Sequence, residues 1–267
     1  MTLPAIPESF TWSASPCGLV LRCRPFEAIA PHLFTTREAG LSSQDDWRRV
    51  ALAVDAEGVA TARQVHGRDV VVVRRGEPRD GEAPAADVRV SNDPATAVAV
   101  RAADCVPILL GDSRSGAVAA VHAGWRGMAT GAVVAAVDAL VREFDVEPSH
   151  LHAAIGPSIG VCCYEVGSEL VDAFAAAGHT RDLIARWFQD SAPPRGSFPR
   201  GSPVADRGPL RLDLAAAGRD QLVLAGVPHD QIHTSGLCTA MNLDVLTSYR
   251  AEKERAGRIA GVIRARG

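Results

Sequence analysis

TAVAVRAADCVPILLGDSRSGAVAAVHAGWRG, residues Thr96–Gly127, is the stretch that decides the fold. It contains three short apolar segments, at 96–101, 106–110 and 117–122, whose lengths are typical of strands. The second and third segments are separated by Gly111–Gly116, a linker of glycine, serine and charged residues that predicts a β-hairpin. The glycines after His122 mark the change from the last strand to a helix.

Segments on both sides of this stretch add further short strands and helices. Ser43, with Asp46 three residues later, predicts a capped helix, and Asp213 predicts the cap of a helix that runs to Leu224. Val70–Val73 is a continuous apolar run, which is typical of a strand buried on both faces. The remaining expected strands are 19–23, 32–36, 151–155 and 232–234, and the remaining expected helices are 128–144 and 169–177. Because strands and helices do not alternate strictly, we expect an α/β fold with mixed sheets rather than a doubly wound parallel sheet.

Composition and charge exclude several classes of protein. The formal net charge is −3, which predicts neither a nucleic-acid partner nor a membrane-surface partner. The basic stretch 250–266 is interrupted by Glu252 and Glu254, which favours a solvated helix face. No signal peptide and no run of 18 apolar residues is expected. The six cysteines are scattered, so a reducing cytoplasmic location follows. Without a repeat or a linker, residues 1–267 are expected to form a single domain; no oligomeric state is predicted.

Three motifs carry the residues with the most distinctive chemistry. They are Gln64–Gly67, Ala103–Pro107 and Val121–Gly127, which contain His66, Cys105 and His122. Two imidazoles and one thiolate suit a catalytic zinc ion, which takes three protein ligands and keeps one open position, and they also suit copper. The residue types alone leave other interpretations open. The histidines and the thiol would then belong to the core, or Cys105 would be a nucleophile with a histidine base and Asp104 nearby. A structural metal would need a fourth ligand.

Three further segments have unusual compositions. Gly124 and Gly127 flank Arg126 before the expected helix, an arrangement that binds anions in some proteins and makes a tight turn in others. Residues 156–165 predict a loop that lines the pocket, with Tyr164 or Glu165 facing inwards. The neighbouring Cys162 and Cys163 in this loop are not expected to share one ion, because adjacent side chains point in different directions. Residues 191–209 are rich in proline and glycine and predict a long loop or lid.

Taken together, these motifs resemble the YfiH-like family, also called the laccase-domain or multicopper polyphenol oxidoreductase family. The resemblance rests on the three motifs above, on residues 155–167 with their CCYEVG block, and on Ser248-Tyr249-Arg250, and it covers about residues 34–258. It implies a layered α/β sandwich with mixed sheets and outer helices. The sequence departs from the family pattern at residues 35–42, where the usual Gly-Gly-Val-Ser turn is replaced, and at Thr247, where an aromatic residue is usual.

The resemblance also implies a function and a set of metal ligands. His66, Cys105 and His122 are the implied ligands, with zinc as the implied ion and copper as the alternative. The implied activity is phosphorolysis of adenosine, inosine, guanosine or methylthioadenosine, accompanied by adenosine deamination, so the expected partners are a purine nucleoside and phosphate. Copper-dependent polyphenol oxidation and proofreading of peptidoglycan precursors are the alternatives. The eight histidines do not indicate the many paired ligands that a multicopper oxidase needs.

Several charged residues have expected roles around this metal. Asp104, next to Cys105, is expected to orient a ligand or the base. The metal and Arg37, Arg126 or Arg250 are expected together to orient phosphate or polarise the base. Two more polar residues are expected to lie in a loop that reaches the pocket: Asp87 and Asn92.

Overall fold

The computed structural model describes residues 3–77, 83–190 and 210–267. In it the stretch Thr96–Gly127 forms β7 (Thr96–Ala102), β8 (Val106–Asp112) and β9 (Val118–Ala123). Strands β8 and β9 pair antiparallel, which confirms the predicted hairpin. Strand β7 belongs to a different sheet, so the chain crosses from one sheet to the other at residues 103–105. Cys105 lies at this crossing.

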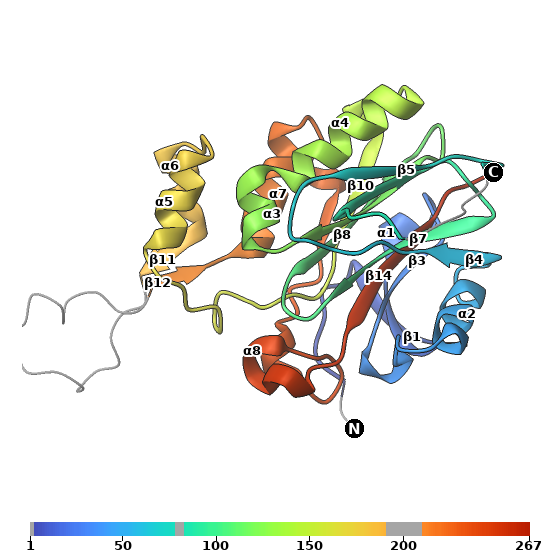
Figure 1. Cartoon of the computed structure of the whole chain (residues 1–267), viewed down its shortest axis with the longest axis horizontal. Coiled ribbons are helices and arrows are strands. Elements are labelled where there is room, and N and C mark those ends of the chain that lie inside the picture. The colour runs from blue at the N-terminus through green and yellow to red at the C-terminus, as the bar shows by residue number, and fades with distance from the viewer. Residues whose placement is uncertain (1–2, 78–82, 191–209) are drawn as a thin grey trace, which may run out of the picture.

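Two sheets of six strands each form the centre of the molecule (Figure 1). The first has the order β1-β2-β3-β14-β7-β4 and the second the order β13-β10-β8-β9-β6-β5. Both sheets combine parallel and antiparallel pairs, as the irregular order of elements predicted. The other strands are β1 (Phe10–Ser15), β2 (Gly18–Cys23), β3 (His32–Thr35), β4 (Gly58–Ala60), β5 (Val70–Val73), β6 (Val88–Ser91), β10 (Leu151–Ile155), β13 (Ile232–Thr234) and β14 (Ile259–Arg264).

The two sheets pack against each other, and helices cover their outer faces. Phe34 and Val100 of the first sheet share a buried cluster with Leu109 and Ala120 of the second sheet. Each outer face is covered by its own helices: α2 (Gln44–Leu52) on the first sheet, and α3 (Trp125–Thr130), α4 (Ala132–Phe144) and α7 (Leu214–Leu224) on the second. This layered arrangement confirms the expected α/β sandwich with mixed sheets and outer helices.

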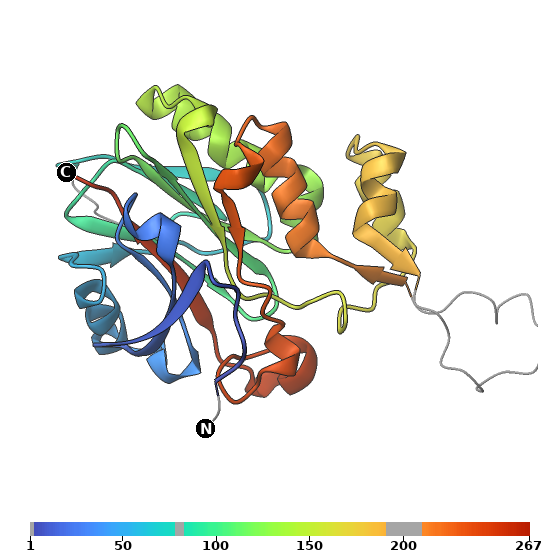
Figure 2. The same ribbon diagram turned by 180° about the vertical axis from the view of Figure 1, so that it is seen from behind.

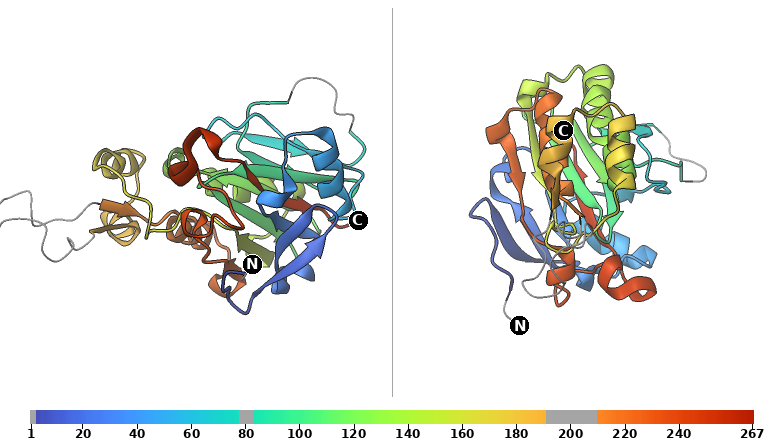
Figure 3. Two further views of the ribbon diagram at one scale, coloured as in Figure 1. Left: turned by 90° about the horizontal axis from the view of Figure 1, so that it is seen from below. Right: turned by 90° about the vertical axis from the view of Figure 1, so that its left-hand side faces the viewer.

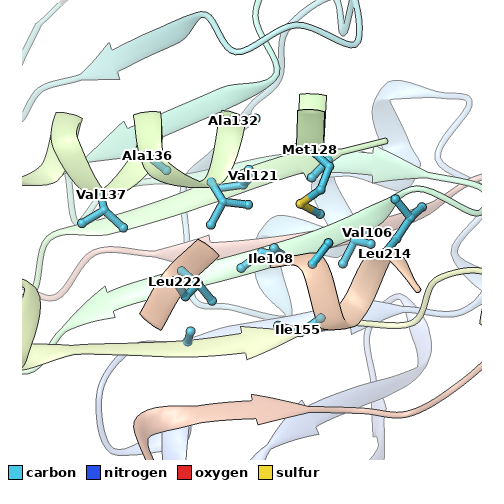
Figure 4. Packing of buried hydrophobic residues seen from close by; sticks show 14 of the residues in the cluster. Val106, Ile108, Val121, Met128, Ala132, Ala136, Val137, Ile155, Leu214 and Leu222 are labelled. Carbon is cyan, nitrogen blue, oxygen red and sulfur yellow. The ribbon is translucent and has the colours of Figure 1, made fainter. Parts of the chain in front are cut away.

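The core between the second sheet and its helices is made of interlocking aliphatic side chains. Met128 of α3 lies over Val121 of β9 and Ile108 of β8, and Leu222 approaches the same sheet from α7 (Figure 4). All four side chains are buried. Burying a side chain of this size contributes about 1.5–3 kcal/mol to the stability of the fold. This packing fixes α3 against the end of β9, next to His122.

A smaller lobe extends from one end of the sandwich (Figures 2 and 3). Its core contains the rings of Phe174, Trp187 and Phe188, and the ring centroids of Phe174 and Phe188 are 5.4 Å apart. The lobe consists of α5 (Glu169–Ala176), α6 (Arg181–Trp187) and the strand pair β11 (Phe188–Asp190) and β12 (Leu210–Leu212). The predicted lid 191–209 lies outside the described residues. The remaining helical turns are α1 (Arg24–Glu27), α8 (Tyr249–Glu252) and five short 3₁₀ segments.

Helix caps follow the local sequence rules. The Ser43 hydroxyl accepts a hydrogen bond from the Asp46 amide at 3.1 Å, and the Asp46 carboxylate accepts one from the Ser43 amide at 2.9 Å. This reciprocal pair is the predicted capping box of α2. Asp213 caps α7 by accepting from the Ala216 amide at 2.9 Å, also as predicted.

Three predicted elements need correction. Residues 250–266 do not form a solvated helix face, because Ile259–Arg264 is the buried strand β14, between β3 and β7. Val70–Val73 is a strand, but β5 lies at the edge of its sheet and three of its residues are only half-buried. The helix expected over 128–144 is broken at Gly131, whose φ of 84° ends α3 before α4 begins. Within the described residues, every helix is too short or too polar to cross a membrane.

His32 on β3 makes the stability of the fold depend on pH. Its Nε2 accepts a hydrogen bond from the Cys23 amide at 2.9 Å, so its proton sits on Nδ1, which donates to the Ala30 carbonyl at 2.9 Å. Burial lowers the pKa of His32 to about 4, below its ordinary value of 6.5. The unfolded chain therefore binds the extra proton first as the pH falls. The contribution of neutral His32 is complete above about pH 6.5 and is lost progressively towards pH 4.

Acidification from pH 7 to pH 5 is expected to lower the free energy of unfolding by about 2 kcal/mol through His32 alone. Urea unfolding of the wild type and of His32→Gln at both pH values measures this contribution. The variant has no ring to protonate, so its loss of stability should be smaller by that amount. Equal losses in the two proteins would show that His32 does not titrate in this range.

Candidate metal centre

Three side chains from distant parts of the chain converge at one point. A ligand atom of each of His66, Cys105 and His122 lies within 4.8 Å of the other two. The two imidazole centroids are 5.0 Å apart, and the rings are inclined at 77°. Ligand atoms around one zinc ion are about 3–4 Å apart, a spread that small side-chain rotations would produce here. No fourth histidine, cysteine or carboxylate joins this group among the described residues.

His122 is oriented by a buried carboxylate. It lies on β9 with only 3% of its surface exposed, and its Nδ1 donates a hydrogen bond to Asp87 Oδ1 at 2.7 Å. The Asp87 bond occupies Nδ1 and leaves Nε2 as the nitrogen that would face an ion. Metal-binding histidines commonly have such a carboxylate on their other ring nitrogen. Burial lowers the pKa of His122, but hydrogen bonds to Asp87 and Cys105 raise it more, to about 9.

The same carboxylate fixes the loop that carries His66. The Asp87 oxygens accept hydrogen bonds from the backbone amides of Val65, His66 and Gly67 at 3.1, 3.0 and 2.7 Å. His66 adopts a φ of 61°, an uncommon conformation for a residue with a side chain, and this loop stabilises it. His66 lies in an exposed loop before β5. Asp87 thus holds two of the three candidate ligands.

Cys105 completes the group from the crossing between the two sheets. Burial raises the pKa of its thiol, but hydrogen bonds to His122 and His66 lower it more, to about 6. Gly124, at the end of β9, makes room for these side chains. A Cβ at this position would lie 2.8 Å from Cys105 Sγ, closer than such atoms approach, and 3.1 Å from a carbon of the His66 ring, which is tighter than most such contacts. Glycine at position 124 is therefore needed for the three side chains to meet.

The candidate metal centre opens into a cleft of about 940 Å³. Its wall carries five cationic side chains but one acidic residue, Asp104. Two tyrosine rings, Tyr164 and Tyr249, also line it. The cationic residues are Arg63, Arg101, Arg250, Lys253 and Arg258. Such a wall favours an anionic ligand close to the metal centre.

Residues 40–42 also line this cleft, so the segment that departs from the family pattern faces it. Burial raises the pKa of Tyr164 to about 12, so its hydroxyl remains protonated at neutral pH. The prediction that Tyr164 or Glu165 faces the pocket is confirmed for Tyr164. The Glu165 carboxylate instead pairs with Arg211 at 3.2 Å.

The charged residues named from the sequence have different contacts from those expected. The Asp104 carboxylate accepts hydrogen bonds from the Thr239 hydroxyl at 2.7 Å and the Arg250 amide at 2.6 Å, so it ties the cleft wall to the residue before Cys105. Arg126 is exposed, and its guanidinium lies over the Trp125 ring at 4.4 Å. Arg37 pairs with Glu252 at 3.0 Å. Neither arginine is among the residues that line the cleft.

Neither of the two loop residues expected to reach the pocket is among the residues that line the cleft: Asp87 is buried behind it and contacts His122. Asn92 accepts a hydrogen bond from the Arg75 amide at 3.0 Å, away from the metal centre. The sequence interpretation gave Asp87 no role with His122. The one local indication of such a role was the position of this carboxylate directly before the strand β6. Of the five cleft cations, the sequence interpretation named Arg250 and missed the other four. Arg101 could have been identified from the sequence, because it is the one charged residue in the otherwise apolar strand β7.

One pair of histidines needs a separate correction. His150 and His152 have the His-x-His spacing that copper centres use, although the sequence interpretation found no paired histidines. His150 lies 3.5 Å from Glu147, and His152 is half-buried on β10. Neither belongs to a group of three or more potential ligands among the described residues.

Comparisons with known proteins agree with this fold. The family model described as multi-copper polyphenol oxidoreductase laccase matches residues 44–266. The purine nucleoside phosphorylase YlmD of Geobacillus stearothermophilus is 32% identical over 81% of this chain and 76% of its own length. The adenosine deaminase RL5 of an unknown prokaryote is 33% identical over 70% of this chain and 68% of its own length. The crystal structure of the hypothetical protein YfiH of Bacillus licheniformis superposes with a TM-score of 0.78 at 25% identity, over 95% and 97% of the two chains.

Proposed function

Because this chain belongs to the YfiH-like family of laccase-domain proteins, we propose that it is a metal-dependent purine nucleoside phosphorylase. One observation carries the proposal: a His-Cys-His group, with one ring held by a buried carboxylate, opens into a cleft lined by five cations. The proposed substrates are phosphate and a purine nucleoside, namely adenosine, inosine, guanosine or methylthioadenosine. Adenosine deamination is proposed as a second activity, because one of the relatives bears that name.

The donor set fits zinc, with copper as the alternative. His66, Cys105 and His122 would hold the ion, and the space that Gly124 leaves beside Cys105 is consistent with an ion among these side chains. Bound zinc supplies Lewis acidity to an oxygen of the reacting molecules. All six cysteines are free thiols, which is consistent with a cytoplasmic location.

The cleft residues can carry out the binding that phosphorolysis requires. Arg101, Lys253 and Arg258 would neutralise phosphate and hold it beside the nucleoside. An oxygen of the phosphate attacks the ribose C1′, and the bond from C1′ to the purine nitrogen breaks. The electron pair of that bond goes to the base, which then takes a proton. The rings of Tyr164 and Tyr249 would pack against the purine and align the reacting atoms.

The physical arguments favour this activity over copper-dependent polyphenol oxidation. A multicopper oxidase transfers electrons from one copper to a cluster of further coppers, which needs several groups of imidazole ligands. Among the described residues, only one group of three or more potential ligands contains a histidine. A cleft with many cations is also better suited to phosphate than to a neutral phenol.

The activity is tested by incubating the zinc-loaded protein with adenosine in the presence and absence of phosphate. Release of adenine is expected to require phosphate, and chromatography measures adenine, inosine and hypoxanthine. Inosine formed without phosphate would support the deaminase alone. Phenol oxidation by the copper-loaded protein, without any turnover of nucleosides, would support the older family name instead.

The metal requirement is tested by removing the ion with a chelator. We expect phosphorolysis to be lost in the metal-free protein and restored by stoichiometric zinc. Full activity in the metal-free protein would favour Cys105 as a nucleophile with a histidine base, the interpretation that the residue types left open.

A further inference from the structure

Three cysteines meet at a second point, outside the cleft. Sulfur atoms of Cys162, Cys163 and Cys238 lie within 4.8 Å of one another, and the sulfurs of Cys162 and Cys163 are 3.5 Å apart. None of the three residues is among those that line the cleft. The sequence interpretation expected the adjacent cysteines to diverge, and this expectation is wrong. The amides of Cys163 and Tyr164 both donate to the Gly160 carbonyl, at 2.9 and 3.1 Å, in a tight turn that brings the two sulfurs together.

The backbone around Cys238 holds the third sulfur in place. Ser158 pairs with the segment that carries Cys238 through hydrogen bonds to Leu237 at 3.2 Å and from Thr239 at 2.9 Å. The Gly160 amide donates a hydrogen bond to Cys238 Sγ at 3.2 Å. Amide donors of this kind stabilise the negative charge of metal-bound thiolates. Two segments that are 75 or more residues apart are thus joined at the sulfurs.

Gly160 also leaves space under the sulfurs. A Cβ at position 160 would lie 3.2 Å from both Cys162 Sγ and Cys238 Cβ, which is tighter than most such contacts. Cys162 is exposed, while Cys238 is buried. Both line a cavity of about 300 Å³, which gives an ion a path from solvent. Arg219 lines the same cavity and would offset part of the charge of three thiolates.

The sulfur distances match a shared ion better than a disulfide. Sulfurs bound to one ion at about 2.3 Å are separated by about 3.8–4.0 Å, whereas bonded sulfurs are about 2.05 Å apart. Soft thiolates select soft ions, and three thiolates without a fourth ligand suit Cu(I). We propose that Cys162, Cys163 and Cys238 form a second metal site, a trithiolate site for Cu(I) that is separate from the His66, Cys105 and His122 centre.

The test uses the full chain with Cys105→Ala, so that the first centre lacks its thiolate. The reduced, metal-free protein is titrated with Cu(I) without oxygen, in competition with a coloured Cu(I) chelator. We expect one Cu(I) per chain, with the ultraviolet charge-transfer absorption of copper–thiolate bonds. Adding Cys162→Ser, Cys163→Ser and Cys238→Ser should remove both signals, whereas adding Cys17→Ala should keep them. Circular dichroism checks that each variant is folded.

Each outcome decides the proposal independently of nucleoside turnover, which this experiment does not measure. A single Cys162→Ser change should weaken Cu(I) binding by at least about tenfold, because it removes the exposed ligand without disturbing the buried Cys238. The proposal is overturned if the Cys105→Ala protein gives no charge-transfer absorption. It is also overturned if the three-serine variant keeps that absorption.

Discussion

Cys105→Ala is expected to lower kcat/KM for phosphorolysis by about three orders of magnitude and to abolish stoichiometric zinc binding at the metal centre. The Cys105 sulfur is the only anionic ligand in the group, and removing it leaves only two imidazoles, the exposed His66 and the buried His122. The Lewis acidity of a bound ion contributes several kcal/mol to transition-state stabilisation, which corresponds to a loss of about this size.

Atomic emission of the dialysed protein measures the zinc content, and steady-state kinetics with phosphate and adenosine measure the rate. Cys17→Ala is the matched control, because Cys17 is a buried thiol on the far side of the first sheet, packed with α2 residues. A Cys105→Ala protein that keeps one zinc per chain and activity within tenfold of the wild type would contradict the assignment of this ligand.

Asp87→Asn is expected to weaken zinc binding by about 10–100-fold, although Asp87 is not itself a ligand. An amide at this position has one acceptor oxygen for hydrogen bonds that now come from three backbone amides and the His122 ring. If its NH₂ group faced Nδ1 of His122, the ring proton would move to Nε2, the nitrogen that must hold the ion. If the NH₂ group of the asparagine faced the loop instead, it would point at a backbone N–H donor in a buried site, at a cost of about 1–3 kcal/mol.

Zinc affinity measured by competition with a chelator, together with urea unfolding, separates the two effects of Asp87→Asn. Asp69→Asn is the matched control, because Asp69 is exposed and lies beside the same loop. Unchanged affinity and stability in Asp87→Asn would show that this carboxylate has no role in the metal centre.

Local patterns predicted much of the fold because local contacts determine those elements. The hairpin of β8 and β9 follows from two apolar segments and a polar linker, and the caps at Ser43 and Asp213 use hydrogen bonds within one turn of helix. Strand β14 was missed because its position depends on distant partners: Gly261 pairs with Phe34 on one side and with Val100 on the other. The charged residues before it resemble a solvated helix and outweighed the one local signal, the apolar run at residues 259–263.

The candidate site shows the same division between local and distant information. The motifs around His66, Cys105 and His122 identified the residues that converge, because motif resemblance carries information about a whole family. Asp87 received no defined role, since its four hydrogen bonds are made to residues 20 or more positions away. Asp104 was assigned to the metal from its neighbour in the sequence, but its partners are Thr239 and Arg250, from the C-terminal part of the chain.

The crossing of the chain between the two sheets at residues 103–105 links the metal centre to the cohesion of the whole sandwich. Cys105 enters from the end of β7 in the first sheet, whereas His122 belongs to the second sheet. An ion that binds both residues would cross-link the two sheets, and the ion would be released when the sheets separate on unfolding. Because the ion would bind the folded chain and not the unfolded one, a higher ion concentration would raise the melting temperature of the protein.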